Sequence, residues 1–142
     1  MHDGLIPMTK ELYMNFLEAS SKEFQQKVWI EDAIKNYISF YDELRMFFFD
    51  VYDIDKLTSE WGYELGFGEE LMNELRVFSK MLHNHDGYDK DMREILNNDP
   101  EWDKIVEQAK KIVRLWDNDP EAKKYRYIPE PMRKFFEQNK LS

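Results

Sequence analysis

The chain has 142 residues, of which 42% are hydrophobic and 15% aromatic, and this apolar content argues against disorder. It carries a formal net charge of −9 and contains no cysteine, which excludes disulfide scaffolds, cysteine-ligated zinc, iron–sulfur clusters and thiol catalysis. A chain of this length can bury a real hydrophobic core, so we expect a single domain over residues 1–142.

Apolar residues recur at helical spacing along most of the chain, and no stretch alternates as a strand does. The capping pattern Ser20–Glu23 separates a first helix at about 10–19 from the rest of the chain. The largest expected element is one long helix over 28–52, because its apolar residues step by three and four positions. They are Ile30, Ile34, Tyr37, Tyr41, Leu44, Phe48 and Val51.

The rest of the chain predicts further helices with clear start and stop signals. Gly66 can end one helix in the left-handed conformation, and Asp99 and Asp119 each precede a proline at a helix start. The expected helices lie near 54–65, 69–83, 88–97, 100–117 and 132–139, with Trp102, Ile105, Ile112 and Trp116 largely buried. We therefore expect an all-α fold, a compact bundle of roughly six to eight helices.

The negative charge is concentrated in one third of the chain. Residues 30–72 hold 11 acidic residues and only 3 basic ones. This region would repel nucleic-acid phosphates, so direct nucleic-acid binding is not expected. The longest uncharged runs are six residues, far short of a membrane span, and no signal peptide is visible. We expect a cytoplasmic protein that does not bind membranes.

On the predicted 28–52 helix, Phe40, Met46 and Phe47 fall away from the apolar stripe and towards the acidic side. Either this helix is central and packed on more than one side, or these residues belong to a partner site, since interfaces favour aromatic residues and methionine. Under the second interpretation the charged contacts are Glu43, Asp50, Asp53 and Asp55, and Phe47 is the apolar anchor. An acidic face that is only solvated is the alternative.

The run from His83 to Asp91 is the densest mixture of metal-ligating residues, but it fits no standard site. Placed on a calcium loop, it would put Leu82 and Arg93 at positions that must coordinate the ion. His83 and His85 are two residues apart, so they would point in different directions on a helix. No Glu-x-x-His pair, Gly-x-Ser-x-Gly elbow or phosphate loop is present. We expect no metal, no cofactor and no catalytic residue.

These observations favour a soluble, acidic, helical module that binds and masks a basic protein partner. In its most specific form this is an immunity protein or antitoxin that inhibits a nuclease-like toxin. One alternative is a nucleic-acid mimic that inhibits a DNA- or RNA-binding protein. Another is a small helical enzyme that uses the His83–Asp91 segment. The oligomeric state is left open.

Overall fold

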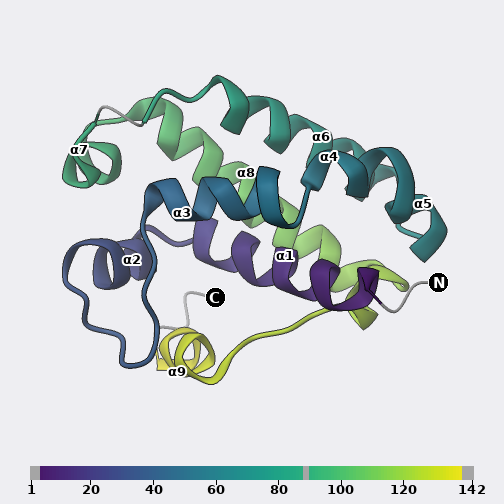
Figure 1. Cartoon of the computed structure of the whole chain (residues 1–142), viewed down its shortest axis with the longest axis horizontal. Coiled ribbons are helices and arrows are strands. Elements are labelled where there is room, and N and C mark those ends of the chain that lie inside the picture. Colours follow the sequence, from purple (N-terminus) through teal and green to yellow (C-terminus); the bar gives the residue numbers. More distant parts are fainter. Residues whose placement is uncertain (1–3, 88–89, 139–142) are drawn as a thin grey trace.

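The computed structural model describes residues 4–87 and 90–138, and all regular structure in these ranges is helical (Figure 1). When each continuous run counts as one helix, these ranges hold eight helices and a short 3-10 turn, so the predicted all-α bundle is confirmed. The elements are α1 (Leu5–Ala19), α2 (Lys22–Gln25), η1 (Gln26–Ile30), α3 (Tyr41–Met46), η2 (Phe47–Val51), α4 (Ile54–Lys56), η3 (Leu57–Trp61), α5 (Gly62–Leu65), α6 (Glu69–Asn84), α7 (Met92–Asn97), α8 (Pro100–Asn118), η4 (Ala122–Lys124) and α9 (Glu130–Gln138). The turns η1, η2 and η3 are π-helical and extend the helix before them.

Helix α8 lies between α1 and α6 and packs against both (Figure 1). Its apolar stripe explains this position, because its four predicted core residues are at most 1% exposed, and their predicted burial is confirmed. These residues are Trp102, Ile105, Ile112 and Trp116. Removing this much apolar surface from water is the main force that holds the three helices together.

An aromatic cluster joins α1, α3–η2, α6 and α8. The Phe16 ring lies 4.8 Å from the rings of both Phe48 and Phe78 and 6.1 Å from that of Trp116, measured between centroids. At the other end of the core, Phe24 packs on Phe135 of α9. The buried apolar side chains of the described helices therefore belong to one core.

Several helix ends follow the local sequence signals. The Asp99 side chain accepts the Trp102 backbone N–H at 3.1 Å and so caps α8, as predicted. Gly66 ends α5 with φ of +86°, also as predicted. Two predictions need correction: Ser21 rather than Ser20 caps α2, and Asp119 precedes only the short turn η4. No helix in the described ranges combines the length and apolar character needed to cross a membrane.

The predicted long helix over 28–52 is wrong. The helix ends at Ile30, the chain is not helical over residues 31–40, and α3 begins only at Tyr41. Asp32 and Asn36 adopt left-handed backbone conformations with φ of 49° and 64°, which turn the chain out of the helical path. We refer to residues 31–40 as the connecting loop. It places Phe40 outside any helix, so the position assigned to Phe40 on a helical face is also wrong.

Candidate functional site

The predicted partner-site residues lie on α3, on η2 and at the start of α4, which follow one another across the molecule (Figure 1). Glu43 is half-buried on α3, and Asp50 is exposed on η2. Phe47 is half-buried and stacks on Tyr52, with 5.5 Å between ring centroids. Part of the surface of Phe47, the predicted apolar anchor, is therefore covered by a contact within the chain.

The other two predicted contacts make structural bonds. The Asp53 side chain accepts the Lys56 backbone N–H at 3.2 Å and caps α4, and Asp53 has a φ of 49°. Asp55 joins α4 to α6, because its carboxylate accepts the Ser79 hydroxyl at 2.5 Å and lies 3.3 Å from Nε2 of His83. Both carboxylates stabilise the fold locally, so neither is a clean probe of a partner contact.

Ion pairs are distributed unevenly along the chain. In the C-terminal part many acidic side chains have a base nearby in the sequence, at N–O distances of 2.9 to 3.4 Å: Glu101–Lys104, Glu107–Lys110, Glu121–Lys124 and Glu130–Lys134. Within the described ranges, five acidic residues from α3 to the start of α6 have no base within 4.0 Å and do not cap a helix, as Asp53 does. We call these the unpaired acids: Asp42, Glu43, Asp50, Glu60 and Glu70.

The arginine of α3, the helix that carries Asp42 and Glu43, donates hydrogen bonds to α6. Arg45 on α3 donates to the carbonyl oxygens of Leu82, His83 and His85 at the C-terminal end of α6. This arrangement suits the negative end of the α6 dipole. The guanidinium therefore ties α3 to α6 and compensates carbonyl groups there.

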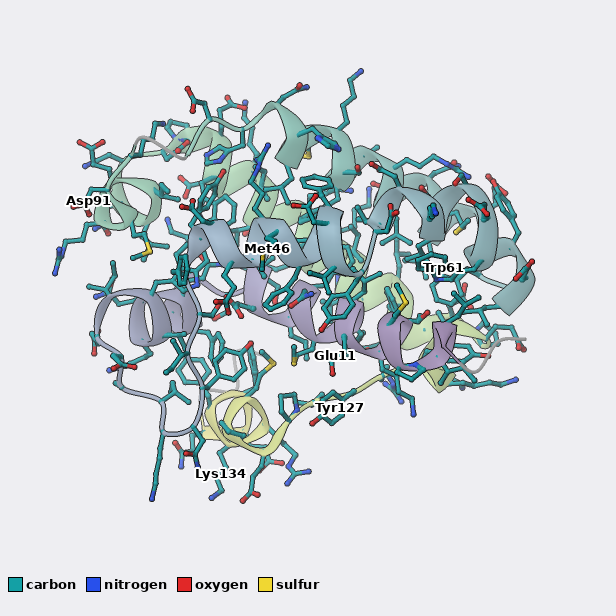
Figure 2. The ribbon with its side chains drawn as sticks, viewed as in Figure 1. Glu11, Met46, Trp61, Asp91, Tyr127 and Lys134 are labelled. Carbon is teal, nitrogen blue, oxygen red and sulfur yellow. The ribbon has the colours of Figure 1, made fainter. Side chains whose placement is uncertain are left out.

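Several large apolar side chains near the unpaired acids are exposed. Met46 and Val51 are each 42% exposed, and Figure 2 shows Met46 on the side of α3 that faces away from α8. Phe40 is 41% exposed and Ile38 is 78% exposed, both in the connecting loop. The sequence analysis singled out Phe40 and Met46 but missed Ile38, because Ile38 shows its exposure only once the loop is known to leave the helix.

A buried carboxylate holds the connecting loop against α1. Glu18 is 1% exposed and accepts three hydrogen bonds, from Trp29 Nε1 at 2.9 Å, the Tyr37 hydroxyl at 2.7 Å and the Ser39 hydroxyl at 2.7 Å. Burial raises the pKa of Glu18, the three hydrogen bonds oppose this shift, and the nearby Glu43 carboxylate adds to it. Burial and the Glu18 charge also raise the pKa of Tyr37. The sequence analysis missed Glu18, whose only local signal is its position between the buried Leu17 and Ala19.

A second buried polar cluster contains His85. Tyr41 Oη lies 2.7 Å from Nδ1 of His85, and Nε2 of His85 lies 2.8 Å from the Asp99 carboxylate, which also accepts Lys90 at 3.0 Å. Burial alone would raise the pKa of Asp99, but hydrogen bonds from Lys90, the Trp102 N–H and His85 hold it below its ordinary value. An ionised Asp99 is an acceptor, so Nε2 of His85 donates to it, while Nδ1 of His85 is hydrogen-bonded to the Tyr41 hydroxyl.

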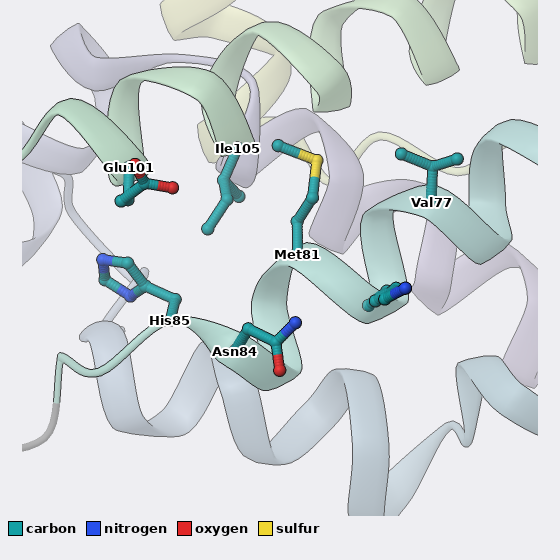
Figure 3. Close-up of a pocket in the computed structure, with 7 residues that line it drawn as sticks. Val77, Met81, Asn84, His85, Glu101 and Ile105 are labelled. Atoms are coloured by element: carbon teal, nitrogen blue, oxygen red, sulfur yellow. The ribbon is translucent and has the colours of Figure 1, made fainter.

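Next to His85, a shallow groove of about 300 Å³ lies between α6 and α8 (Figure 3). Val77, Met81 and Ile105 line its apolar part, while Asn84, His85 and Glu101 lie at the other end. Because both ring nitrogens of His85 are bonded to other side chains, His85 offers this groove no free nitrogen as a general base.

The two histidines of the His83–Asp91 run are held apart. His83 is exposed and stacks on Phe49, with 3.8 Å between ring centroids, whereas His85 points into the buried cluster. Within residues 4–87 and 90–138, no three His, Asp or Glu side chains are grouped so that they could hold a metal ion. Residues 88 and 89 of the run lie outside the described residues.

Comparison with known proteins gives no relative from which a role could be transferred. No model of a known protein family matches the chain, and neither the curated proteins nor the solved structures contain a significant match.

Proposed function

We propose that the protein is a binding module whose unpaired acids dock on a basic protein partner. The most specific form of this proposal is an immunity protein or antitoxin that masks the nucleic-acid groove of a nuclease-like toxin. The proposal is supported above all by the contrast between these acids and the paired acids of α8 and α9. Where a lysine ammonium forms an ion pair with a carboxylate one turn away, the field of that carboxylate is largely cancelled close to the surface.

The unpaired acids lack this cancellation, so their field extends into solvent. An uncompensated field of one sign steers an oppositely charged partner and raises its association rate. Most of these acids lie on the exposed side of their helices, and exposed apolar side chains stand near them, including Met46 and Val51. Apolar surface surrounded by charge is typical of protein interfaces, in which the apolar part is buried and the charge sets orientation.

Charge also decides which class of partner is favoured. A nucleic acid or an anionic membrane would be repelled by the unpaired acids, whereas a nucleic-acid-binding protein presents the lysine and arginine side chains that complement them. An inhibitor of such a protein needs no catalytic group of its own, and the bonded nitrogens of His85 agree with this.

The test starts from a pull-down of partners from the native cell lysate at low and high salt, followed by kinetics with the purified partner. The variant Asp42→Lys/Asp50→Lys reverses two unpaired acids and avoids Asp53 and Asp55, which stabilise α4. We expect its association rate at low salt to fall about ten-fold or more and to depend less on salt.

The matched control is Glu107→Lys/Glu130→Lys, which makes the same change in net charge at two exposed acids that have lysine partners. Like Asp42, Glu130 stands in the first turn of its helix, so the effects on the helix dipoles are comparable. We expect this control to change the association rate about two-fold or less. Equal effects of the two double variants would show that only net charge matters, and an unchanged rate in both would refute the proposal.

A further inference from the structure

The connecting loop carries two exposed apolar side chains that do not belong to the core. Ile38 is 78% exposed and Phe40 is 41% exposed, while the residues that alternate with them, Tyr37 and Ser39, face Glu18. A single exposed apolar residue on a protein surface is ordinary. Here two of them stand on alternate positions of one non-helical segment, and the preceding Tyr37 and the intervening Ser39 are bonded inwards, so Ile38 and Phe40 form an outward-facing pair.

The loop is held in this shape from both sides of Ile38. The neighbours of Ile38 donate their hydroxyl groups to the same buried carboxylate at 2.7 Å, and Trp29 completes the set from η1. Asp32 and Asn36 supply the left-handed turns, which these two residue types adopt at lower cost than most others. The segment that carries Ile38 and Phe40 is thus fixed before any partner arrives.

Fixing the loop in this way costs free energy, and the packing of Ile34 and Tyr37 on the core offsets part of that cost. A carboxylate is removed from water, and its pKa is raised by burial. The side chain at the centre of the fixed segment, Ile38, contributes little to the core because most of its surface stays in solvent. A segment ordered in advance loses less conformational entropy on binding, so the arrangement favours association with another molecule.

We propose that the connecting loop is the apolar anchor of the interface, and that Ile38 and Phe40 insert into an apolar recess on a cationic protein. This inference rests on the proposed function and moves the anchor from Phe47 to the loop. Charge indicates which kind of partner this loop would bind. Asp32, Asp42 and Glu43 lie on or beside the loop and have no base within ion-pair distance among the described residues. Lys35 is the basic residue of the loop itself, so negative charge predominates there. A second copy of this chain or an anionic lipid surface would bring like charges together, and a cationic protein would not.

The first experiment replaces Ile38 with the photo-crosslinking residue benzoylphenylalanine and irradiates cells that express the variant. The matched control places the same residue at Val77, which is 44% exposed and lines the groove between α6 and α8. We expect position 38 to crosslink to a protein of net positive charge and position 77 to give little of that product. Crosslinking only to a second copy, to lipid or to nucleic acid, or no product from position 38, would overturn the inference.

The second experiment measures binding of the crosslinked protein, once purified, to Ile38→Ala and to the control Val77→Ala. Because Ile38 is mostly exposed, its truncation should leave the melting temperature nearly unchanged. We expect Ile38→Ala to dissociate about ten-fold faster or more, with an association rate within about two-fold of wild type. An unchanged dissociation rate would refute the proposal that Ile38 anchors the interface.

The two proposals fail in different ways. If reversal of Asp42 and Asp50 slows association while Ile38→Ala leaves the dissociation rate unchanged, docking through the unpaired acids is supported and anchoring through the connecting loop is refuted. If position 38 crosslinks and Ile38→Ala dissociates faster while the charge reversal has no effect, anchoring through the connecting loop is supported and docking through the unpaired acids is refuted.

Discussion

Replacing Glu18 with Ala removes the acceptor of three hydrogen bonds at once. Two of the donors, the Trp29 indole N–H and the Ser39 hydroxyl, belong to side chains that are each 6% exposed, so water cannot readily replace the carboxylate. The third donor, the Tyr37 hydroxyl, is part-buried and can turn towards solvent.

The magnitude follows from these partners. A buried donor left without an acceptor costs about 1–3 kcal/mol, so two of them cost about 2–6 kcal/mol. Removing a carboxylate that was itself expensive to bury offsets part of this cost. We therefore expect Glu18→Ala to lower the free energy of unfolding by about 2–4 kcal/mol. Glu18→Gln keeps the shape and one acceptor oxygen, so its cost at neutral pH should be about 1 kcal/mol.

The pH dependence gives a second readout with a definite sign. The pKa of Glu18 is raised above its ordinary value of 4.5, so between these two values the folded protein holds a proton that the unfolded chain has lost. The stability that this proton confers is fully present below about pH 4.5 and is lost as the pH rises through the folded pKa. Relative to Glu18→Gln, wild type should therefore lose stability as the pH rises across this window.

Urea unfolding of wild type and both variants at several pH values measures these differences, and hydrogen exchange at pH 7 locates them. In Glu18→Ala, the protection of backbone amides from exchange should fall mainly in the connecting loop and at the end of α1. If Glu18→Ala costs less than about 0.5 kcal/mol, the three hydrogen bonds do not hold the loop as described. A stability difference between wild type and Glu18→Gln that is flat or rises with pH would refute the assignment of a raised pKa.

Three further predictions concern the core, a helix end and metal binding. Ile112→Ala should lower the free energy of unfolding by about 2–5 kcal/mol in urea, because Ile112 is fully buried, and a change below about 0.5 kcal/mol would contradict its place in the core. Gly66→Ala should lower the free energy of unfolding in urea by about 1 kcal/mol, since the φ of +86° at Gly66 suits glycine. An unchanged urea midpoint would show that α5 does not need glycine at this position. Elemental analysis should find no stoichiometric zinc, iron or calcium, and one metal per chain that is lost in His83→Ala/His85→Ala would overturn this expectation.

Local signals were sufficient for most of the helices. The residues that cap α8 and end α5, Asp99 and Gly66, act on backbone groups within a few positions of themselves, so sequence alone could place them. The same holds for the apolar stripes of α6 and α8, because a helix that repeats every 3.6 residues must bury such a stripe.

The connecting loop shows where this reasoning fails. Its apolar spacing continues that of the helices on both sides, and periodicity alone predicted one helix over 28–52. An interaction across the fold stabilises the non-helical path that begins at the left-handed Asp32, since Tyr37 and Ser39 bond to a carboxylate on α1 that stands 19 and 21 residues earlier. The candidate site changes with it: Ile38 becomes exposed and Phe40 leaves the helix, whereas Phe47 packs partly on Tyr52.

The sequence by itself determined the helical class, the core stripes of α6 and α8, most helix ends and the concentration of negative charge, since each depends on neighbours within one or two helical turns. Only the tertiary structure decided that Glu18 is buried, that the connecting loop is not helical, and that Arg45 is engaged with α6, away from the unpaired acids. These outcomes depend on groups that are far apart in the chain and meet only when α1, α3 and α6 pack together. Burial then makes a hydrogen bond to a charge strong enough to override the local preference for helix.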